Sequence, residues 1–121
     1  MTSLRSTLFA NNLGSASLLL VSGSGPASVV SNGYNLSDTV LPLLDKATDR
    51  TNVNPQLGIL QYNSSQTRTY ALLAGSAAID GGIRTDGIND QRGAGFQRTI
   101  DLSPANAAGG DGTDIGAFEV Q

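Results

Sequence analysis

The chain has 121 residues, which is the size of one domain, and it carries a net charge of −3 with only 14% charged residues. This balance excludes a nucleic-acid binder, because neutralising phosphates takes clustered Lys and Arg, and the six arginines here are scattered. The sequence contains neither Cys nor His, which excludes a disulfide framework, a Ser-His-Asp triad and most zinc sites.

The first third of the chain predicts short strands separated by turns. Residues 3–10 are predicted to form a strand closed by Asn11, Asn12 and Gly14, and residues 16–22 form a second strand candidate. After a Gly/Ser/Pro turn at 23–26, residues 27–31 are a third candidate, and the Asn32-Gly33 turn leads into residues 34–36. Turns this regular suit either an antiparallel sandwich or a solenoid of short strands.

The rest of the chain predicts little regular structure. With one Glu and one Lys, long surface helices are not expected, and residues 37–50, with unevenly spaced leucines and Pro42, are the one plausible helix. Residues 51–66 predict an irregular loop with an apolar stretch at 57–60, and residues 67–73 predict a strand. From residue 81 onward, glycines and aspartates separate short apolar islands, which indicates a loop-rich tail.

Three motifs in the second half stand in a distinctive order: ALLAGSAAID at 71–80, DQRG at 90–93 and DIGAFE at 114–119. With GYNL at 33–36 and NPQLGIL at 54–60, the chain resembles the choice-of-anchor Q domain. Members of that family form the C-terminal end of right-handed parallel β-helix proteins of the pectin-lyase-like type, mostly bacterial and exported. This sequence departs from the family where Ala74 and Ala77 replace prolines and where 63–66 reads NSSQ instead of NGGP.

The resemblance implies an all-β fold in which the last coils of a right-handed parallel β-helix precede a loop-rich C-terminal cap. Residues 1–50 would form the terminal coils with a short irregular or helical segment, and residues 51–121 would form the cap of the same structural unit. Residues 1–36 supply about one and a half coils, fewer than the roughly three repeats that a solenoid needs. We therefore expect a piece of a longer chain that is marginally stable or self-associates when isolated.

The motifs also contain most of the charged residues with a candidate role. We interpret them as a structural polar network, in which Arg92 forks to carboxylates and the others accept backbone N–H groups: Asp80, Asp90, Arg92, Asp114 and Glu119. The functional alternatives are a carboxylate pair for glycoside hydrolysis or a calcium site. GGDGTD at 109–114 matches the start of a calcium-binding nonapeptide, which makes Asp111 and Asp114 weak calcium candidates, but Gly116 occupies its apolar position and only one copy is present.

We expect the cap to be held by an apolar core formed by Leu60, Tyr70, Leu72, Ile79, Ile115 and Phe118. Neither a catalytic residue nor a cofactor is expected. The predicted function is a structural C-terminal cap of an extracellular or cell-surface, adhesin-like protein, with its signal outside this chain.

The expected partners are the upstream coils of the same protein, with a surface carbohydrate as a further candidate; nucleic acid is not expected, and neither is a membrane span in this chain. The alternatives are the end of a polysaccharide lyase or glycoside hydrolase, or a carbohydrate-binding module. The latter needs exposed aromatic rings, and three Tyr and three Phe leave few to spare from the core.

Overall fold

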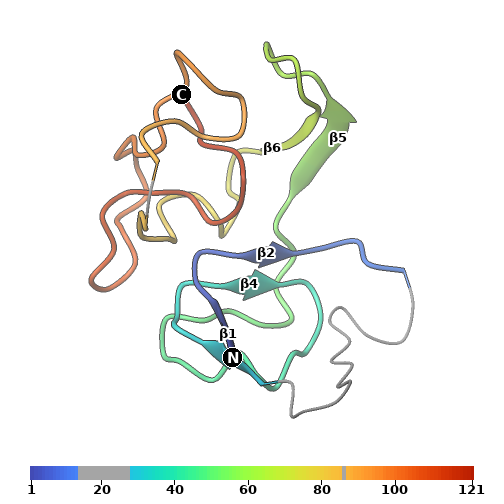
Figure 1. The fold of residues 1–121 in the computed structure, drawn as a ribbon, viewed down its shortest axis with the longest axis vertical. Helices are drawn as coiled ribbons and strands as arrows, with labels where there is room; N and C mark the ends of the chain where they lie inside the picture. The colour runs from blue at the N-terminus through green and yellow to red at the C-terminus, as the bar shows by residue number, and fades with distance from the viewer. Residues whose placement is uncertain (14–27, 86) are drawn as a thin grey trace.

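The computed structural model describes residues 1–13, 28–85 and 87–121, and within them the fold is all-β without a helix. The predicted all-β class is thus confirmed, while the strand candidate at 16–22 lies outside the described residues. The described strands are short: β1 (Thr2–Leu4), β2 (Leu8–Phe9), β3 (Val29–Ser31), β4 (Leu36–Ser37), β5 (Leu57–Gln61) and β6 (Thr69–Leu72). Figure 1 shows the first strands in one half of the molecule and the C-terminal loops, orange to red, in the other.

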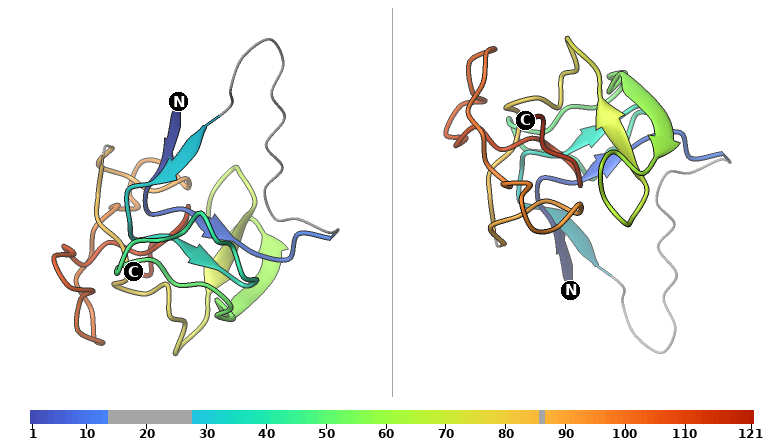
Figure 2. Two further views of the ribbon diagram at one scale, coloured as in Figure 1. Left: turned by 90° about the horizontal axis from the view of Figure 1, so that it is seen from below. Right: turned by 90° about the horizontal axis from the view of Figure 1, so that it is seen from above.

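The N-terminal strands stack in parallel. β1 pairs with β3, with Thr2 opposite Val29, and β2 pairs with β4, with Leu8 opposite Leu36. A parallel bridge from Leu36 to Arg50 continues the second ladder, and the amide of Ser37 donates to the carbonyl of Arg50 at 2.8 Å. Residues 8–9, 36–37 and 50–53 therefore form three successive rungs that run the same way (Figures 1 and 2).

A buried asparagine fixes the corner between β3 and β4. Asn35 is fully buried; its Oδ1 accepts from the amide of Thr7 at 3.0 Å, and its Nδ2 donates to the carbonyl of Leu4 and to Asp49. The same Asp49 carboxylate accepts the amide of Asn35 at 3.0 Å. One side chain thus joins three consecutive rungs, which supplies the donors and acceptors that a corner lacks when the ladder is interrupted.

The helix expected over residues 37–50 does not form. The segment turns instead: the amide of Leu44 bonds the carbonyl of Leu41, and both leucines are buried. Two physical reasons account for the error. The uneven leucine spacing offers no continuous apolar face for a helix, and pairing Ser37 with Arg50 in the ladder requires the chain between them to loop back.

The hairpin of β5 and β6 corrects a second expectation, since residues 57–61 form a strand where a loop was expected. The two strands pair antiparallel, with Leu60 opposite Tyr70 and Gln61 opposite Thr69, and a bulge lies between Leu57 and Leu60. The strand predicted over 67–73 is present as β6. The apolar stretch at 57–60 was too short to reveal strand pairing without its partner.

The core lies where the rungs, the hairpin and the C-terminal loops meet. It consists of Leu36, Leu72, Ala78, Ile79 and Ile115, with partly buried Leu8, Val53, Leu57, Ala77, Phe118 and Val120 packed against it. Of the residues expected there, Leu72, Ile79 and Ile115 are buried and Phe118 is half-buried.

Leu60 and Tyr70 were wrongly placed in the core. They are 45% and 44% exposed, because they pair closer to the turn of the hairpin than Leu57 and Leu72, the pair that packs in or against the core. In the described part of the chain, no helix is long and apolar enough to cross a membrane.

Candidate functional site

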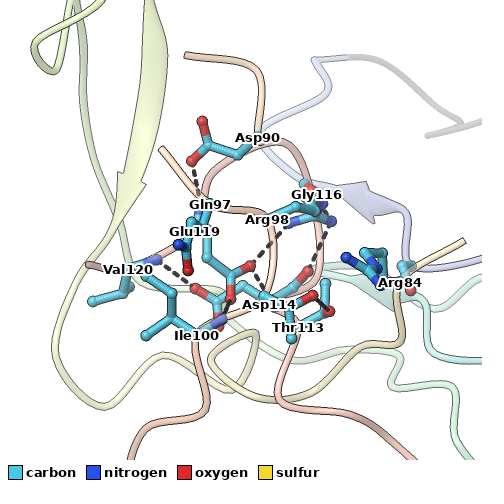
Figure 3. A network of polar contacts seen from close by, with 12 residues as sticks. Arg84, Asp90, Gln97, Arg98, Ile100, Thr113, Asp114, Gly116, Glu119 and Val120 are labelled. Carbon is cyan, nitrogen blue, oxygen red and sulfur yellow. Dashed lines mark hydrogen bonds and ion pairs between the residues drawn. The ribbon is translucent and has the colours of Figure 1, made fainter. Parts of the chain in front are cut away.

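The C-terminal loops are held by a buried network of carboxylates that accept backbone amides (Figure 3). Among the described residues from 78 to 121 the structure contains no strand, so the loop amides need partners other than a ladder. The carboxylates of this network are almost completely buried, with residue exposures of 6% or less: Asp80, Asp90, Asp114 and Glu119. The structure brings together all five residues predicted for a structural network. Each residue is linked to the next by at least one hydrogen bond that involves a backbone amide.

Glu119 is the centre of this network. Its Oε1 accepts the amide of Ile100 at 2.8 Å, and its Oε2 accepts the amide of Asp114 at 2.9 Å and Nη1 of Arg98 at 3.1 Å (Figure 3). Its own amide donates to Oδ2 of Asp90 at 2.9 Å. One side chain therefore fastens the segments around residues 90, 100 and 114 to the C-terminus.

Asp114 extends the connection to the loop around residue 80. Its Oδ1 accepts the amide of Asp80 and its Oδ2 accepts the amide of Val120, both at 2.8 Å. Asp80 is bound more weakly: its Oδ1 accepts the amide of Leu102 at 3.3 Å, and its buried Oδ2 has no partner within the described residues. Asp80 also holds a left-handed backbone, with φ of +51°, which Asp tolerates better than most residues.

Asp90 and Arg92 form a buried ion pair of 2.7 Å. The guanidinium donates hydrogen bonds to both carboxylate oxygens of Asp90 and also to the carbonyl of Glu119. Its flat faces lie over the rings of Phe96 and Phe118, with Cζ 4.1 and 3.9 Å from the two ring centroids. The guanidinium thus has polar partners along its edge and aromatic rings against its π system, an arrangement that Lys could not adopt.

Arg98 was missed by the sequence analysis. It pairs with Glu119, and its Nη2 donates to the carbonyls of Asp114 and Gly116 at 3.1 and 2.7 Å (Figure 3). Arg98 lies outside the three motifs, so the resemblance did not point to it. The available signal was the charge count, since four buried carboxylates with one arginine predict a second cation nearby.

Burial dominates the protonation of these carboxyl groups. It raises the pKa of Glu119 to about 7, against the opposing effect of the amides of Asp114 and Ile100 and of the nearby Arg98 charge. Burial likewise raises the pKa of Asp114 and of Asp80. The folded state therefore binds protons at Glu119 near neutral pH.

The hydrogen bonds of the buried carboxylates favour a structural role in holding the loops over a role in catalysis. General acid and base catalysis requires a carboxyl group within hydrogen-bond reach of a substrate, whereas both oxygens of Glu119 and of Asp114 already accept backbone amides and lie buried. Of the two calcium candidates, Asp111 is exposed and accepts the amides of Arg84 and Thr113. No group of three or more His, Cys, Asp or Glu able to hold a metal ion occurs among residues 1–13, 28–85 and 87–121.

The chain matches no family model, no curated protein and no solved structure.

Proposed function

We propose that the chain is a structural C-terminal cap of an extracellular or cell-surface parallel β-helix protein, related to the choice-of-anchor Q domain, with no catalytic role. The observation that carries the proposal is that three rungs stacked in parallel share one core with the C-terminal loops. Leu8, Leu36 and Val53, one from each rung, pack with Ile79 and Ile115. An end of a solenoid needs such a cover, because its last coils would otherwise expose apolar side chains to water.

The N-terminal edge supports the same proposal. The amide of Thr2 donates to the carbonyl of Ser28, and the carbonyl of Leu4 accepts the amide of Asn32, so both residues bond the segment that contains β3. In a parallel ladder, the residue between them, Ser3, turns its amide and carbonyl to the opposite edge. A preceding coil of the same protein is the natural partner of that edge, and the right-handed β-helix is the architecture in which such coils accumulate.

The test is a fusion. Residues 2–121 are joined in register to a parallel β-helix whose own terminal coils have been removed and which aggregates as a result. We expect a soluble monomer that unfolds in a single transition, because the cap covers the exposed end. The control carries Ile115→Asp, which places a charge in the core and should restore aggregation. Aggregation of the unaltered fusion, or two independent unfolding transitions in it, would refute the proposal.

A carbohydrate-binding role is a second candidate, because the structure leaves more aromatic surface free than the sequence indicated. Tyr62 and Tyr70 are 54% and 44% exposed, and sugars stack on aromatic faces. A glycan array probed with the intact chain tests this candidate, and reduced retention of Tyr62→Ala on any glycan bound by the parent would support it.

A further inference from the structure

One face of the hairpin carries side chains that do not contribute to the buried core. The register places Leu60 opposite Tyr70 and Gln61 opposite Thr69. Continued by one more residue, two residues beyond Leu60 and Tyr70, it brings Tyr62 opposite Arg68 on the same face as Leu60 and Tyr70. The guanidinium of Arg68 lies over the ring of Tyr62, with Cζ 5.1 Å from its centroid, which agrees with this pairing. We refer to Leu60, Tyr62, Arg68 and Tyr70 as this face; the hairpin of β5 and β6 that carries it stands beside the C-terminal loops in Figure 1.

A pocket of about 280 Å³ opens between this face and the C-terminal segment. Its walls are largely apolar, formed chiefly by Leu8, Leu57, Leu60, Tyr70, Leu72 and Phe118. The polar side chains that line it are Arg68, Thr69 and Gln91. At about 30 Å³ for each water molecule, the volume corresponds to roughly nine waters, or to a ligand of about ten non-hydrogen atoms.

Arg68 is the one charged residue that lines the pocket. Among the described residues it forms no ion pair, in contrast to Arg92 and Arg98, which are bound to buried carboxylates. Its contact with Tyr62 occupies a face of the guanidinium and leaves the N–H groups along its edge for a ligand. A planar fork of N–H donors matches the paired oxygens of an anion such as a carboxylate.

We propose that this pocket binds a small molecule with an apolar body and a carboxylate. The apolar body lies against Leu57, Leu72 and Phe118, and the carboxylate accepts hydrogen bonds from Arg68 at the rim. An apolar pocket with few, well-placed polar groups is the usual form of a small-molecule site, and the charge of Arg68 selects an anion over a neutral ligand. The proposal goes beyond a capping role and does not depend on it.

The test uses 3-phenylpropionate as the probe and 3-phenylpropan-1-ol as its uncharged counterpart. The intact chain is titrated with each while the methyl NMR signals of Leu57, Leu72 and Ile115 are followed. We expect saturable shifts with both probes and tighter binding of the acid. Arg68→Gln should weaken binding of the acid at least tenfold and leave binding of the alcohol unchanged.

Arg84→Gln is the matched control, because it removes the same charge from an exposed arginine that does not line this pocket. It should bind both probes as the parent does. Leu60→Ala, a change at an already exposed wall residue, should weaken binding of both probes. The proposal is overturned if neither probe shifts the pocket signals, or if Arg68→Gln and Arg84→Gln bind the acid equally well.

Discussion

Glu119 accepts three hydrogen-bond donors in a site without water-exposed surface, so its protonation couples directly to folding. Its pKa of about 7 in the folded state exceeds the ordinary value of 4.5. The folded state therefore binds the proton more tightly than the unfolded state does. The stability that Glu119 contributes is fully present below pH 4.5 and is lost as the pH rises through about 7.

The first prediction follows from this linkage. Between pH 4.5 and 7, the free energy of unfolding should fall with rising pH, with about 3 kcal/mol attributable to Glu119. Glu119→Gln, which cannot ionise, should flatten this slope, although the mutant should be less stable because its amide faces donors. Urea unfolding at several pH values measures the slope. Asp45→Asn, at an exposed carboxylate, should keep the parental slope, and equal slopes in the parent and Glu119→Gln would contradict the assignment.

The second prediction concerns the stacked arginine. Arg92→Lys keeps the charge but loses the forked contact with Asp90 and the stacking between Phe96 and Phe118. We expect it to lower the free energy of unfolding by about 2 to 4 kcal/mol. Arg84→Lys, at an exposed position, should change it by less than about 0.5 kcal/mol. Denaturant titration compares the two variants, and a small effect of Arg92→Lys would mean that its stacking adds little stability.

At the residue scale, the sequence was informative about which residues form the network and less so about their partners. Short acidic side chains beside glycines in a strandless segment are suited to accept loop amides, and Asp80, Asp90 and Asp114 do so. Arg92 meets an aspartate two residues earlier, a local contact within reach of sequence reasoning. The contact between Arg98 and Glu119 spans 21 residues and depends on how the loops fold.

At the scale of elements, the turn before β4 depends on glycine. Gly33 has φ of +86°, and a Cβ there would lie 2.4 Å from Oγ1 of Thr48, the atom that accepts the amide of Tyr34. Gly93 has a similar φ of +92°, but an added Cβ would meet nothing within 4 Å. The two positions therefore separate the cost of the backbone conformation from the cost of the clash.

The third prediction uses this pair. Gly93→Ala should destabilise the chain by about 1 to 2 kcal/mol through its left-handed backbone alone. Gly33→Ala should cost at least about 1 kcal/mol more, because it also disrupts the bond between Thr48 and Tyr34. Thermal and urea unfolding of both variants measure the difference, and equal losses would show that Thr48 moves aside without cost.

The sequence predicted the positions of turns between elements better than it predicted whether a segment is a helix, a strand or a loop. Turn residues such as Asn32 and Gly33 marked the end of β3 and the approach to β4 because their backbone preferences are local. The segments 37–50 and 57–61 were misassigned because tertiary pairing decided their structure. The amide of Ser37 bonds the carbonyl of Arg50, and Leu57 pairs with Leu72, and neither partner is evident from local composition.

At the scale of the whole molecule, β1 pairs only with β3 among the described strands, and we expect its second edge to govern how isolated chains associate. Ser3 turns its amide away from β3, and we expect a second copy to pair with that edge through this amide. The fourth prediction is that the isolated chain sediments as a concentration-dependent mixture and that Ser3→Pro shifts it toward monomer. Proline removes the outward N–H and leaves the amide of Thr2 free to bond Ser28.

Ser3→Ala is the control for this experiment, since it keeps the amide and should associate as the parent does. A parent chain that is monomeric at every concentration would count against an open edge, and so would equal association of Ser3→Pro and Ser3→Ala.

The all-β class could be predicted from the sequence because the scarcity of helix-favouring residues acts along the whole chain. The exposure of Leu60 and Tyr70 could not be predicted from the sequence, because it depends on which other segments pack against the hairpin.

The carboxylate network has a consequence for hydrogen exchange. Slow amide exchange is usually a property of strands and helices, yet here the amides of Asp80, Ile100, Asp114 and Val120 are bound to buried carboxylates in loops. Because Glu119 and Asp114 hold several of these amides at once, opening at one carboxylate releases segments far apart in the chain. Deuterium uptake around residues 80, 100 and 114–120 should therefore be slow and should accelerate together, which would identify the C-terminal loops as one cooperative unit.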